Sequence, residues 1–250
     1  MTVAGVDLNW GEETRGRIAV ALADDAGTVR LTTGLNDAEM FDLLAVARPQ
    51  AVALDIPIDG CAGLSALAPT RPIDRALAGA GVPVLPSYKA GVRGTMLRDR
   101  IRSILGPYTP VYEVYPYGAY KVLAYTAVVD RSSPQESAPG DGFRQWWPPK
   151  YKRALLRRER ILAAVYLRRL LLHPDIGLAF DPPLPHPGQL PLDVLGDAYD
   201  ACLAALPALY WQSRKPLICL AGSPSQGEML LLAHPWLQEA LAQHVPVRKP

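Results

Sequence analysis

Short apolar runs alternate with amphipathic segments along this chain, and their order predicts the strands and helices. Residues 3–8 read VAGVDL and residues 16–25 read GRIAVALADD, and a third apolar run covers 28–34. These runs have the length and composition of β-strands. The turn sequence Asp25-Ala26-Gly27 lies between the last two runs and indicates a hairpin. The first three elements are therefore expected to be strands.

After the third run, apolar residues recur at the spacing of an α-helix. Asn36 or Asp37 can cap a helix that ends before Pro49, and its apolar positions are Met40, Phe41, Leu44 and Ala45. Residues 51–58 (AVALDIPI) form a nearly continuous hydrophobic run, which is typical of a strand covered on both faces. A helix and a fourth strand are therefore expected.

The second half of the chain contains more helical patterns. We predict helices over 71–81, 93–105 and 193–206, a strand over 111–116 ended by Pro116, and a strand over 216–222. A basic amphipathic helix is expected around 152–172, and a loop insertion around 130–150. Three strands before the first helix, followed by alternating elements, predict one α/β domain over 1–250 with a mixed sheet.

Composition narrows the class of protein. Of the 250 residues, 49% are hydrophobic and 20% are charged, as in ordinary globular domains. No apolar run reaches the roughly 18 residues of a membrane-spanning helix, and the N-terminus lacks the pattern of a secretory signal. Cys61, Cys202 and Cys219 form no CxxC pair, so neither a zinc site nor a disulfide framework is predicted. A cytoplasmic location without a membrane partner is therefore expected.

The small net charge of +2 hides an uneven distribution. Between Arg144 and Arg169 there are nine Lys or Arg residues and a single acid, Glu159. The rest of the chain is net acidic. This polarity favours an anionic partner such as nucleic acid for the basic segment, although a solvated helix face is an equally good explanation.

Acidic residues occur inside or at the end of several apolar runs. Asp7, Asp55 and Glu113 lie in the predicted strands, and Asp197 and Asp200 lie three residues apart in the late helix. A buried carboxylate is costly unless a cation or hydrogen bonds compensate it. Residues three apart share a helix face, so both helical acids could point at the end of the sheet. Convergence of these acids would make a site for divalent metal.

Some of the acids also have a structural explanation, whereas Asp7 and Asp55 in their apolar runs have few. Asp197 could simply stabilise the start of its helix through the helix dipole. Asp59 is better explained as a turn residue beside Gly60. Glu113 could be a fourth ligand, or it could pair with an arginine such as Arg71 or Arg75. These alternatives stay open at the level of sequence.

The order of the acids resembles the ribonuclease H-like fold, in which acids lie on the first strand, at the end of the fourth and on a late helix. More closely, the chain is similar to a family of predicted ribonuclease H-like nucleases, domain of unknown function 429. The matching segments are GVDLNW (5–10), ALDIPID (53–59), RPIDRAL (71–77), YEVYP (112–116), the basic helix from Tyr151, DAYDACLAAL (197–206) and GSPSQGEMLLLAHP near the end. DAYDACLAAL is also distantly similar to the late-helix motif of Holliday-junction resolvases. The family more often has His at the position of Tyr115.

The resemblance implies a mixed five-stranded sheet flanked by helices and a nuclease with a two-metal carboxylate site. Oxygen-only ligands suit Mg²⁺ or Mn²⁺ rather than zinc. Asp7 would bridge the metals, Asp55 would hold one, and Asp200 with Asp197 would hold the other. Glu113 completes the set of candidate catalytic residues.

Basic residues could contact the phosphates of a nucleic acid. The candidates are Lys152, Arg153, Arg157 and Arg160 on the basic helix, together with Arg71, Lys89 and Arg93. Trp146 and Trp147 could stack on bases, or they could close a loop onto the core.

Two other functions remain as alternatives. A non-catalytic nucleic-acid-binding or scaffold protein would use the basic helix without needing metal. An actin-like or sugar-kinase-type ATPase fits less well, because the chain has no glycine-rich phosphate-binding loop. No Ser-His-Asp or Cys-His constellation can be assembled from the spacing.

Overall fold

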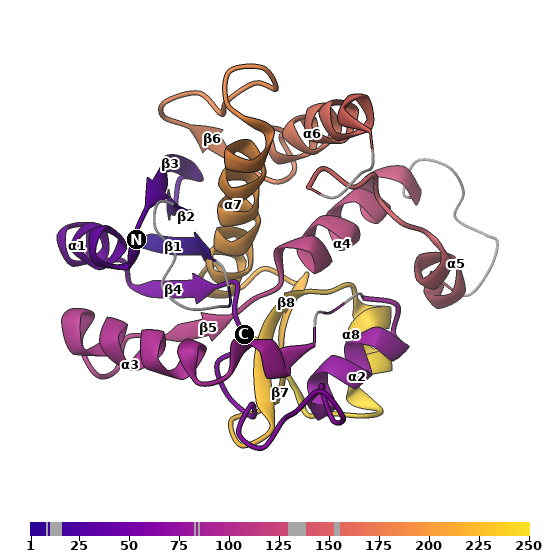
Figure 1. Cartoon of the computed structure of the whole chain (residues 1–250). Coiled ribbons are helices and arrows are strands. Elements are labelled where there is room, and N and C mark those ends of the chain that lie inside the picture. Colours follow the sequence, from indigo (N-terminus) through magenta and orange to yellow (C-terminus); the bar gives the residue numbers. More distant parts are fainter. Residues whose placement is uncertain (9, 11–16, 83, 85, 130–138, 153–155) are drawn as a thin grey trace.

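A computed structural model describes the chain from Met1 to Pro250 except residues 9, 11–16, 83, 85, 130–138 and 153–155. The described residues form a mixed sheet of nine strands in the order β6-β3-β2-β1-β4-β5-β8-β7-β9, with helices on both faces (Figure 1). The α/β class and the mixed sheet are confirmed, whereas the predicted number of five strands is wrong.

The elements have the following bounds. The strands are β1 Thr2–Asp7, β2 Ile18–Asp24, β3 Thr28–Leu35, β4 Ala51–Leu54, β5 Val111–Glu113, β6 Ala179–Phe180, β7 Ile218–Ser223, β8 Gly227–Leu232 and β9 Val247–Arg248. The helices are α1 Asp37–Ala47, α2 Pro72–Gly79, the 3-10 helix η1 Ser87–Ala90, α3 Arg93–Leu105, α4 Pro116–Val129, α5 Pro139–Gln145, α6 Arg157–Leu171, α7 Leu192–Gln212 and α8 Pro235–Ala242.

The directions of the central strands place several strand ends together. β1 pairs with β2 and β2 pairs with β3 in antiparallel fashion. β1 pairs with β4, β4 with β5, and β5 with β8 in parallel. The carboxyl ends of β1, β4 and β5 therefore meet at one edge of the sheet.

The four strands beyond the predicted five come mostly from the closing part of the chain. β7 and β8 form an antiparallel hairpin, and β8 joins the sheet through β5. The two-residue strands β9 and β6 extend the sheet at its two edges. β7 corresponds to the strand predicted over 216–222, whereas β6, β8 and β9 were not predicted as strands.

Successive side chains of the central strands point to opposite faces of the sheet, and each face has its own hydrophobic core. Val6, Val20 and Leu54 pack with α1 and α3 on one face. Val3 and Ala53 pack on the other face with α7, α4 and α6. Figure 1 shows α1 and α3 together on one side of the sheet and α7 crossing the other. This burial on both faces explains the nearly continuous apolar runs in the sequence.

Several predicted boundaries differ from the structure. β4 ends at Leu54 and not at Ile58, and the basic helix α6 begins at Arg157 and not at residue 152. Helix α4 begins at Pro116, where only the end of a strand was expected. Helix α5 lies within the predicted loop 130–150, and residues 130–138 of that loop lie outside the described part of the chain. Proline at the first position of a helix is favourable, so Pro116 marks a start as well as a stop.

Gly5 allows α7 to lie directly against β1. A Cβ atom at Gly5 would come within 2.2 Å of the backbone nitrogen of Ala205 and 2.3 Å of the carbonyl oxygen of Ala201. Both atoms belong to the helix backbone, so no side-chain rotation can relieve the clash. We expect Gly5→Ala to lower the free energy of unfolding by about 3 kcal/mol, as measured by urea denaturation.

Gly79 provides the matched control for this change. It ends α2, and a Cβ atom there meets nothing within 4 Å. Gly79→Ala should leave stability unchanged or raise it slightly. Equal unfolding midpoints for the two variants would contradict the close approach of α7 to β1.

Candidate metal and nuclease site

The predicted acids lie at one edge of the sheet. Asp7 is the last residue of β1, Asp55 directly follows β4, and Glu113 is the last residue of β5. Because these strands are parallel neighbours, their carboxyl ends lie side by side. Helix α7 packs across β1 and carries Asp197 and Asp200.

The side chain of Lys152 connects three of these acids. Its Nζ lies 2.9 Å from Asp7 Oδ2, 2.9 Å from Asp197 Oδ1 and 2.5 Å from Asp200 Oδ2. Asp7 and Asp200 are buried, with side chains 7% and 8% exposed, whereas that of Lys152 is 32% exposed. The structure thus gathers Asp7, Asp197 and Asp200 around one positive charge, and we call these three acids with Asp55 the acid cluster.

Lys152 reaches the acid cluster from the segment before α6. Its stem passes over Gly196, where a Cβ atom would lie 2.8 Å from Lys152 Cγ. The neighbouring Tyr151 is buried and donates its hydroxyl hydrogen bond to Asp200 Oδ1. Arg160 Nε in turn donates to the Tyr151 carbonyl oxygen at 3.2 Å. In this structure Lys152 therefore pairs with the acid cluster and lies before α6, whereas the sequence had predicted it on the basic helix as a phosphate contact.

Burial lowers the pKa of Lys152, but the charges of Asp200, Asp7 and Asp197 more than offset that effect, so its pKa lies above the usual value. The ammonium group therefore stays protonated at neutral pH. Desolvation raises the pKa of Tyr151 as well, and the adjacent Asp200 raises it further. Tyr151 thus remains a neutral hydrogen-bond donor.

Asp55 is the least compensated member of the acid cluster. Its Oδ1 atom is buried and has no hydrogen-bond partner among the described residues. Desolvation and then the charge of Asp200 raise its pKa to about 7, although Lys152 and a hydrogen bond with Asp7 act in the opposite direction. Burial also raises the pKa of Asp7, against the effect of Lys152. Without a further cation, Asp7 and Asp55 hold protons more tightly than ordinary carboxyls.

Glu113 is held in a different arrangement. Both of its oxygens pair with Arg71, at 2.7 Å from Nη1 and 2.5 Å from Nη2. Arg71 also pairs with both oxygens of Asp74, and Glu113 accepts a hydrogen bond from the Ile58 backbone at 2.9 Å. Of the two alternatives for Glu113, the structure shows the arginine pair. We call Arg71, Asp74 and Glu113 the buried charge network.

Arg71 is therefore not available to phosphates. Its side chain is only 1% exposed, and its guanidinium group is occupied by two carboxylates and the Asp59 carbonyl oxygen. Its prediction as a nucleic-acid contact is corrected by this burial. Asp59, which was expected to act within its own turn, pairs with Arg98 on α3 at 2.6 Å.

The other predicted basic contacts are distributed over two regions. Lys89 is exposed on η1, and Arg93 begins α3 with its Nη2 atom 2.8 Å from Asp37. Arg157 is exposed at the start of α6, whereas Arg160 pairs with Asp193 at 2.5 Å. Arg153 lies outside the described residues.

The two adjacent tryptophans differ in burial: Trp146 packs against the core, and Trp147 is exposed. Trp146 contacts Tyr125 edge-on at a centroid distance of 5.7 Å. The ring of Trp147 lies 3.8 Å from Nζ of Lys121, which also donates to the Gly81 carbonyl oxygen at 2.6 Å. Desolvation lowers the pKa of Lys121 to about 8. The structure therefore shows packing onto the core for Trp146, whereas Trp147 is 49% exposed and contacts Lys121.

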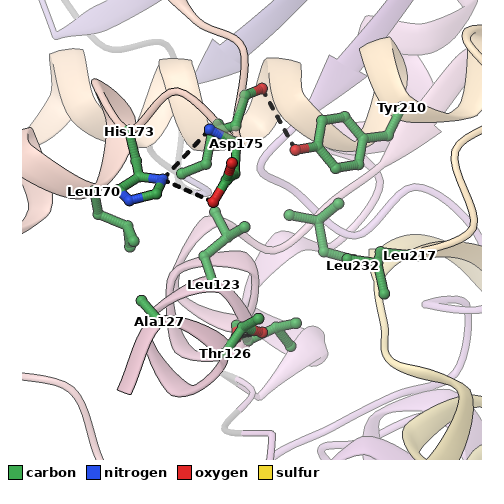
Figure 2. A pocket seen from close by; sticks show the side chains of 11 residues that line it. Leu123, Thr126, Ala127, Leu170, His173, Asp175, Tyr210, Leu217 and Leu232 are labelled. Atoms are coloured by element: carbon green, nitrogen blue, oxygen red, sulfur yellow. Dashed lines mark hydrogen bonds and ion pairs between the residues drawn. The ribbon is translucent and has the colours of Figure 1, made fainter. Parts of the chain in front are cut away.

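A small cavity of about 170 Å³ lies at the other end of α7. Figure 2 shows its apolar lining, including Leu123 and Leu232, with His173 and Asp175 paired at one side at 3.3 Å. Tyr210 lines this cavity and follows Asp200 by ten residues on α7, which corresponds to about 15 Å along the helix axis. The cavity includes no member of the acid cluster, so we assign the chemistry to the strand ends.

The donor atoms of the acid cluster suit a hard divalent cation. Asp7, Asp55, Asp197 and Asp200 offer only oxygen, and one of these oxygens lacks a partner. As the side chains are arranged, no three His, Cys, Asp or Glu residues in the described part of the chain form a ligand set for a metal ion. Instead, the Nζ atom of Lys152 lies between Asp7, Asp197 and Asp200.

Searches among protein-family models, curated proteins and solved structures find no match for this chain. No helix in the described ranges has the length and apolar character needed to cross a bilayer. The sequence had not identified Tyr151 as part of the site or Lys152 as the partner of the acids. The sequence feature that could have revealed this approach is Gly196, one turn before Asp200, because a residue without a side chain lets the Lys152 stem lie close to α7.

Proposed function

We propose that this protein is a divalent-metal-dependent nuclease that hydrolyses phosphodiester bonds of nucleic acid. The observation that carries the proposal is the convergence of Asp7, Asp55, Asp197 and Asp200, from three separate elements, at one edge of the sheet. Three of these acids pair with the ammonium group of Lys152 and the fourth, Asp55, lies within their electrostatic influence, so the site holds more acids than cations. Such an excess is costly in a purely structural site and useful for binding a divalent cation.

The arrangement of strands supports a ribonuclease H-like fold within the larger sheet. Strands β3-β2-β1-β4-β5 are consecutive neighbours, with hairpins joining the first three and parallel pairing of the last three. Acids stand at the end of the first strand, directly after the fourth, and on the late helix α7. This is the order that the resemblance to the predicted ribonuclease H-like family implies.

Mg²⁺ or Mn²⁺ is the cation that the donor set fits. Asp7 and Asp55 would hold it from the strand ends, and Asp197 and Asp200 would hold it from α7. A divalent cation bound among these oxygens would activate water and neutralise charge at the phosphorus of a phosphodiester. The unpartnered Oδ1 atom of Asp55 and the raised pKa of that carboxyl are both relieved by an added positive charge.

The chain's own residues have distinct tasks in this proposal. Lys152 neutralises the acids when no metal is bound and moves aside when one binds. Because its side chain is partly exposed, its ammonium group can turn toward solvent or toward a substrate phosphate. Tyr151 orients Asp200 through its hydroxyl group. Glu113 acts through Arg71 and the Ile58 backbone, so it is a positioning residue.

Sequence-independent affinity would come from the exposed cations of α6. Arg157, Arg158 and Arg169 are exposed on α6, which follows directly after the segment that carries Lys152. Such side chains contact phosphates and give binding that weakens as salt concentration rises. Nucleic acid is therefore the proposed partner.

A non-catalytic nucleic-acid-binding protein is the second candidate. The observation that favours it is that Lys152 already pairs with three of the proposed ligands. If the ammonium group cannot be displaced, the acid cluster is a structural ion-pair network. This alternative predicts binding of nucleic acid without metal-dependent cleavage.

The two candidates differ in a cleavage assay. The purified chain is incubated with single-stranded, duplex, hybrid and branched substrates in Mg²⁺, in Mn²⁺ and in EDTA. The proposal expects cleavage that requires metal and is lost in Asp200→Asn but retained in Asp193→Asn, a matched change at an exposed position of α7. Binding without cleavage across the panel would favour the second candidate.

Displacement of Lys152 is tested separately with Lys152→Met. Removing the ammonium group leaves buried carboxylates without a partner, so we expect a loss of about 1 to 3 kcal/mol in EDTA. Mn²⁺ should then raise the melting temperature more than in the unchanged protein, because it no longer competes with Lys152. Lys150→Met, at an exposed position, is the control. If Mn²⁺ raised the melting temperature equally in the unchanged protein, Lys152→Met and Lys150→Met, the proposal that Mn²⁺ and the Lys152 ammonium group occupy the same place would be contradicted.

A further inference from the structure

A large cavity lies on the face of the sheet covered by α1 and α3, and one of its lining residues, Trp10, is hydrogen-bonded to the backbone of Asp55. Its volume is about 690 Å³, within the range of roughly 300 to 1,000 Å³ typical of small-molecule sites. Three aromatic and three basic side chains are among the residues that line it: Trp10, Phe41, Tyr88, Lys89, Arg93 and Arg100. Aromatic faces and cations together match the two parts of a nucleotide, its base and its phosphate.

The charge of the lining favours an anion. Among the described residues that line the cavity, Asp37 is the one acid, and it faces Arg93 at 2.8 Å. Within this described lining, the three cations therefore outnumber the acids by two. The Nε atom of Arg93 is buried and has no hydrogen-bond partner within the described ranges, so this lining side chain has one unsatisfied donor. Arg100 lies 5.9 Å from the Phe41 ring, where a cation and an aromatic face attract each other.

The cavity and the acid cluster share one segment of backbone. Nε1 of Trp10 donates to the Asp55 carbonyl oxygen at 2.7 Å. The first turn of α3 rests on the residues after Asp55: a Cβ atom at Gly94 would lie 1.9 Å from the Pro57 carbonyl oxygen, and Thr95 donates to the Ile58 carbonyl oxygen at 2.5 Å. A ligand in the cavity would thus lie beside the strand end that carries Asp55.

We propose that this cavity is a subsite for one unpaired nucleotide of the substrate strand. The inference rests on the proposed function, since it takes nucleic acid as the substrate. The aromatic side chains would receive the base, and Arg93 with Lys89 would bind an adjacent phosphate. A base can enter such a cavity only when it is unstacked and unpaired. The substrate class is therefore single-stranded nucleic acid, or a strand with a flipped or unpaired nucleotide next to the cleavage site.

A binding experiment tests this subsite without requiring cleavage. Affinities of a fluorescently labelled single-stranded oligonucleotide and of its duplex are measured in EDTA, at one salt concentration, for the full chain and its variants. Arg93→Gln and Tyr88→Ala should each weaken single-strand binding by about tenfold while changing duplex binding less than about twofold. Lys89→Gln changes an exposed side chain and should give a smaller loss in the same direction.

Arg75→Gln is the matched control, because Arg75 is exposed on α2 and does not line the cavity. Equal affinities of the control and all three cavity variants would overturn the subsite, whereas metal-dependent cleavage would still support the nuclease. Selective loss of single-strand binding in a chain that never cleaves would support the subsite and remove the nuclease proposal. Absence of binding to either oligonucleotide would overturn both.

Discussion

Asp7→Asn is expected to reduce metal-dependent cleavage by at least about 100-fold while the chain stays folded. Asparagine keeps the shape of the side chain but removes the charge that faces Lys152 and Asp55. Loss of even an indirect contact to a bound metal typically costs about 10- to 100-fold in metal affinity or activity, so loss of a direct ligand should cost more. The measurement is the initial cleavage rate in Mg²⁺ and in Mn²⁺ on the best substrate.

Stability provides an independent readout for the same variant. Desolvation raises the pKa of Asp7, so its charged form is unfavourable in the metal-free fold. Asp7→Asn should therefore not lower the melting temperature in EDTA, and it should abolish the rise caused by Mn²⁺. Asp42→Asn, at an exposed position of α1, should behave like the unchanged protein in both assays. Cleavage that is unaffected by Asp7→Asn would rule out the metal site.

Arg71→Met should have the largest effect on stability, about 3 to 5 kcal/mol. Arg71 neutralises Glu113 and Asp74 in the buried charge network, and all three side chains are almost fully buried. Removing one member of a buried ion pair leaves the other charges without compensation. Globular domains have a total stability of only about 5 to 15 kcal/mol, so the variant should unfold at a much lower urea concentration.

The pH dependence of this loss follows from the carboxyls that remain. Burial raises the pKa of Glu113 even with Arg71 present, and loss of Arg71 removes the main opposing effect. A carboxyl with a raised pKa in the folded state destabilises the fold as pH rises through that pKa. The stability difference between Arg71→Met and the unchanged protein should therefore be larger at pH 8 than at pH 5.

Arg75→Met is the control within the same helix. Arg75 is exposed, and its Nη1 atom donates to the Thr70 carbonyl oxygen at 2.8 Å. Its replacement should change stability by less than about 1 kcal/mol. A similar unfolding midpoint for both variants would show that the buried charge network does not support the strand ends.

The predicted elements that agree best with the structure are those set by local signals. Helix α3 has the predicted bounds, Arg93–Leu105. Helix α1 begins after Asn36, whose side chain accepts a hydrogen bond from the Glu39 backbone while Glu39 caps Asn36 in return. Both signals lie within a few residues of the helix end. Neighbouring residues therefore suffice to predict such elements.

The elements that were wrong depend on distant parts of the chain. The segment 227–232 becomes a strand because β5 and β7 are available on either side. Residues 56–58 continue the apolar run of β4, but they leave the sheet, and the Ile58 backbone donates a hydrogen bond to Glu113 instead. Local hydrophobicity does not contain this information.

The sequence by itself determined the α/β class and the acids at the strand ends, because apolar spacing sets secondary structure and a carboxylate in an apolar run is costly. Only the tertiary structure decided which cation compensates each acid. Lys152 is 145 residues from Asp7 along the chain, and Arg71 is 42 residues from Glu113. Ion pairs depend on distances in space, and folding sets those distances. Hence the sequence indicated the acid cluster and could not separate Glu113 from it.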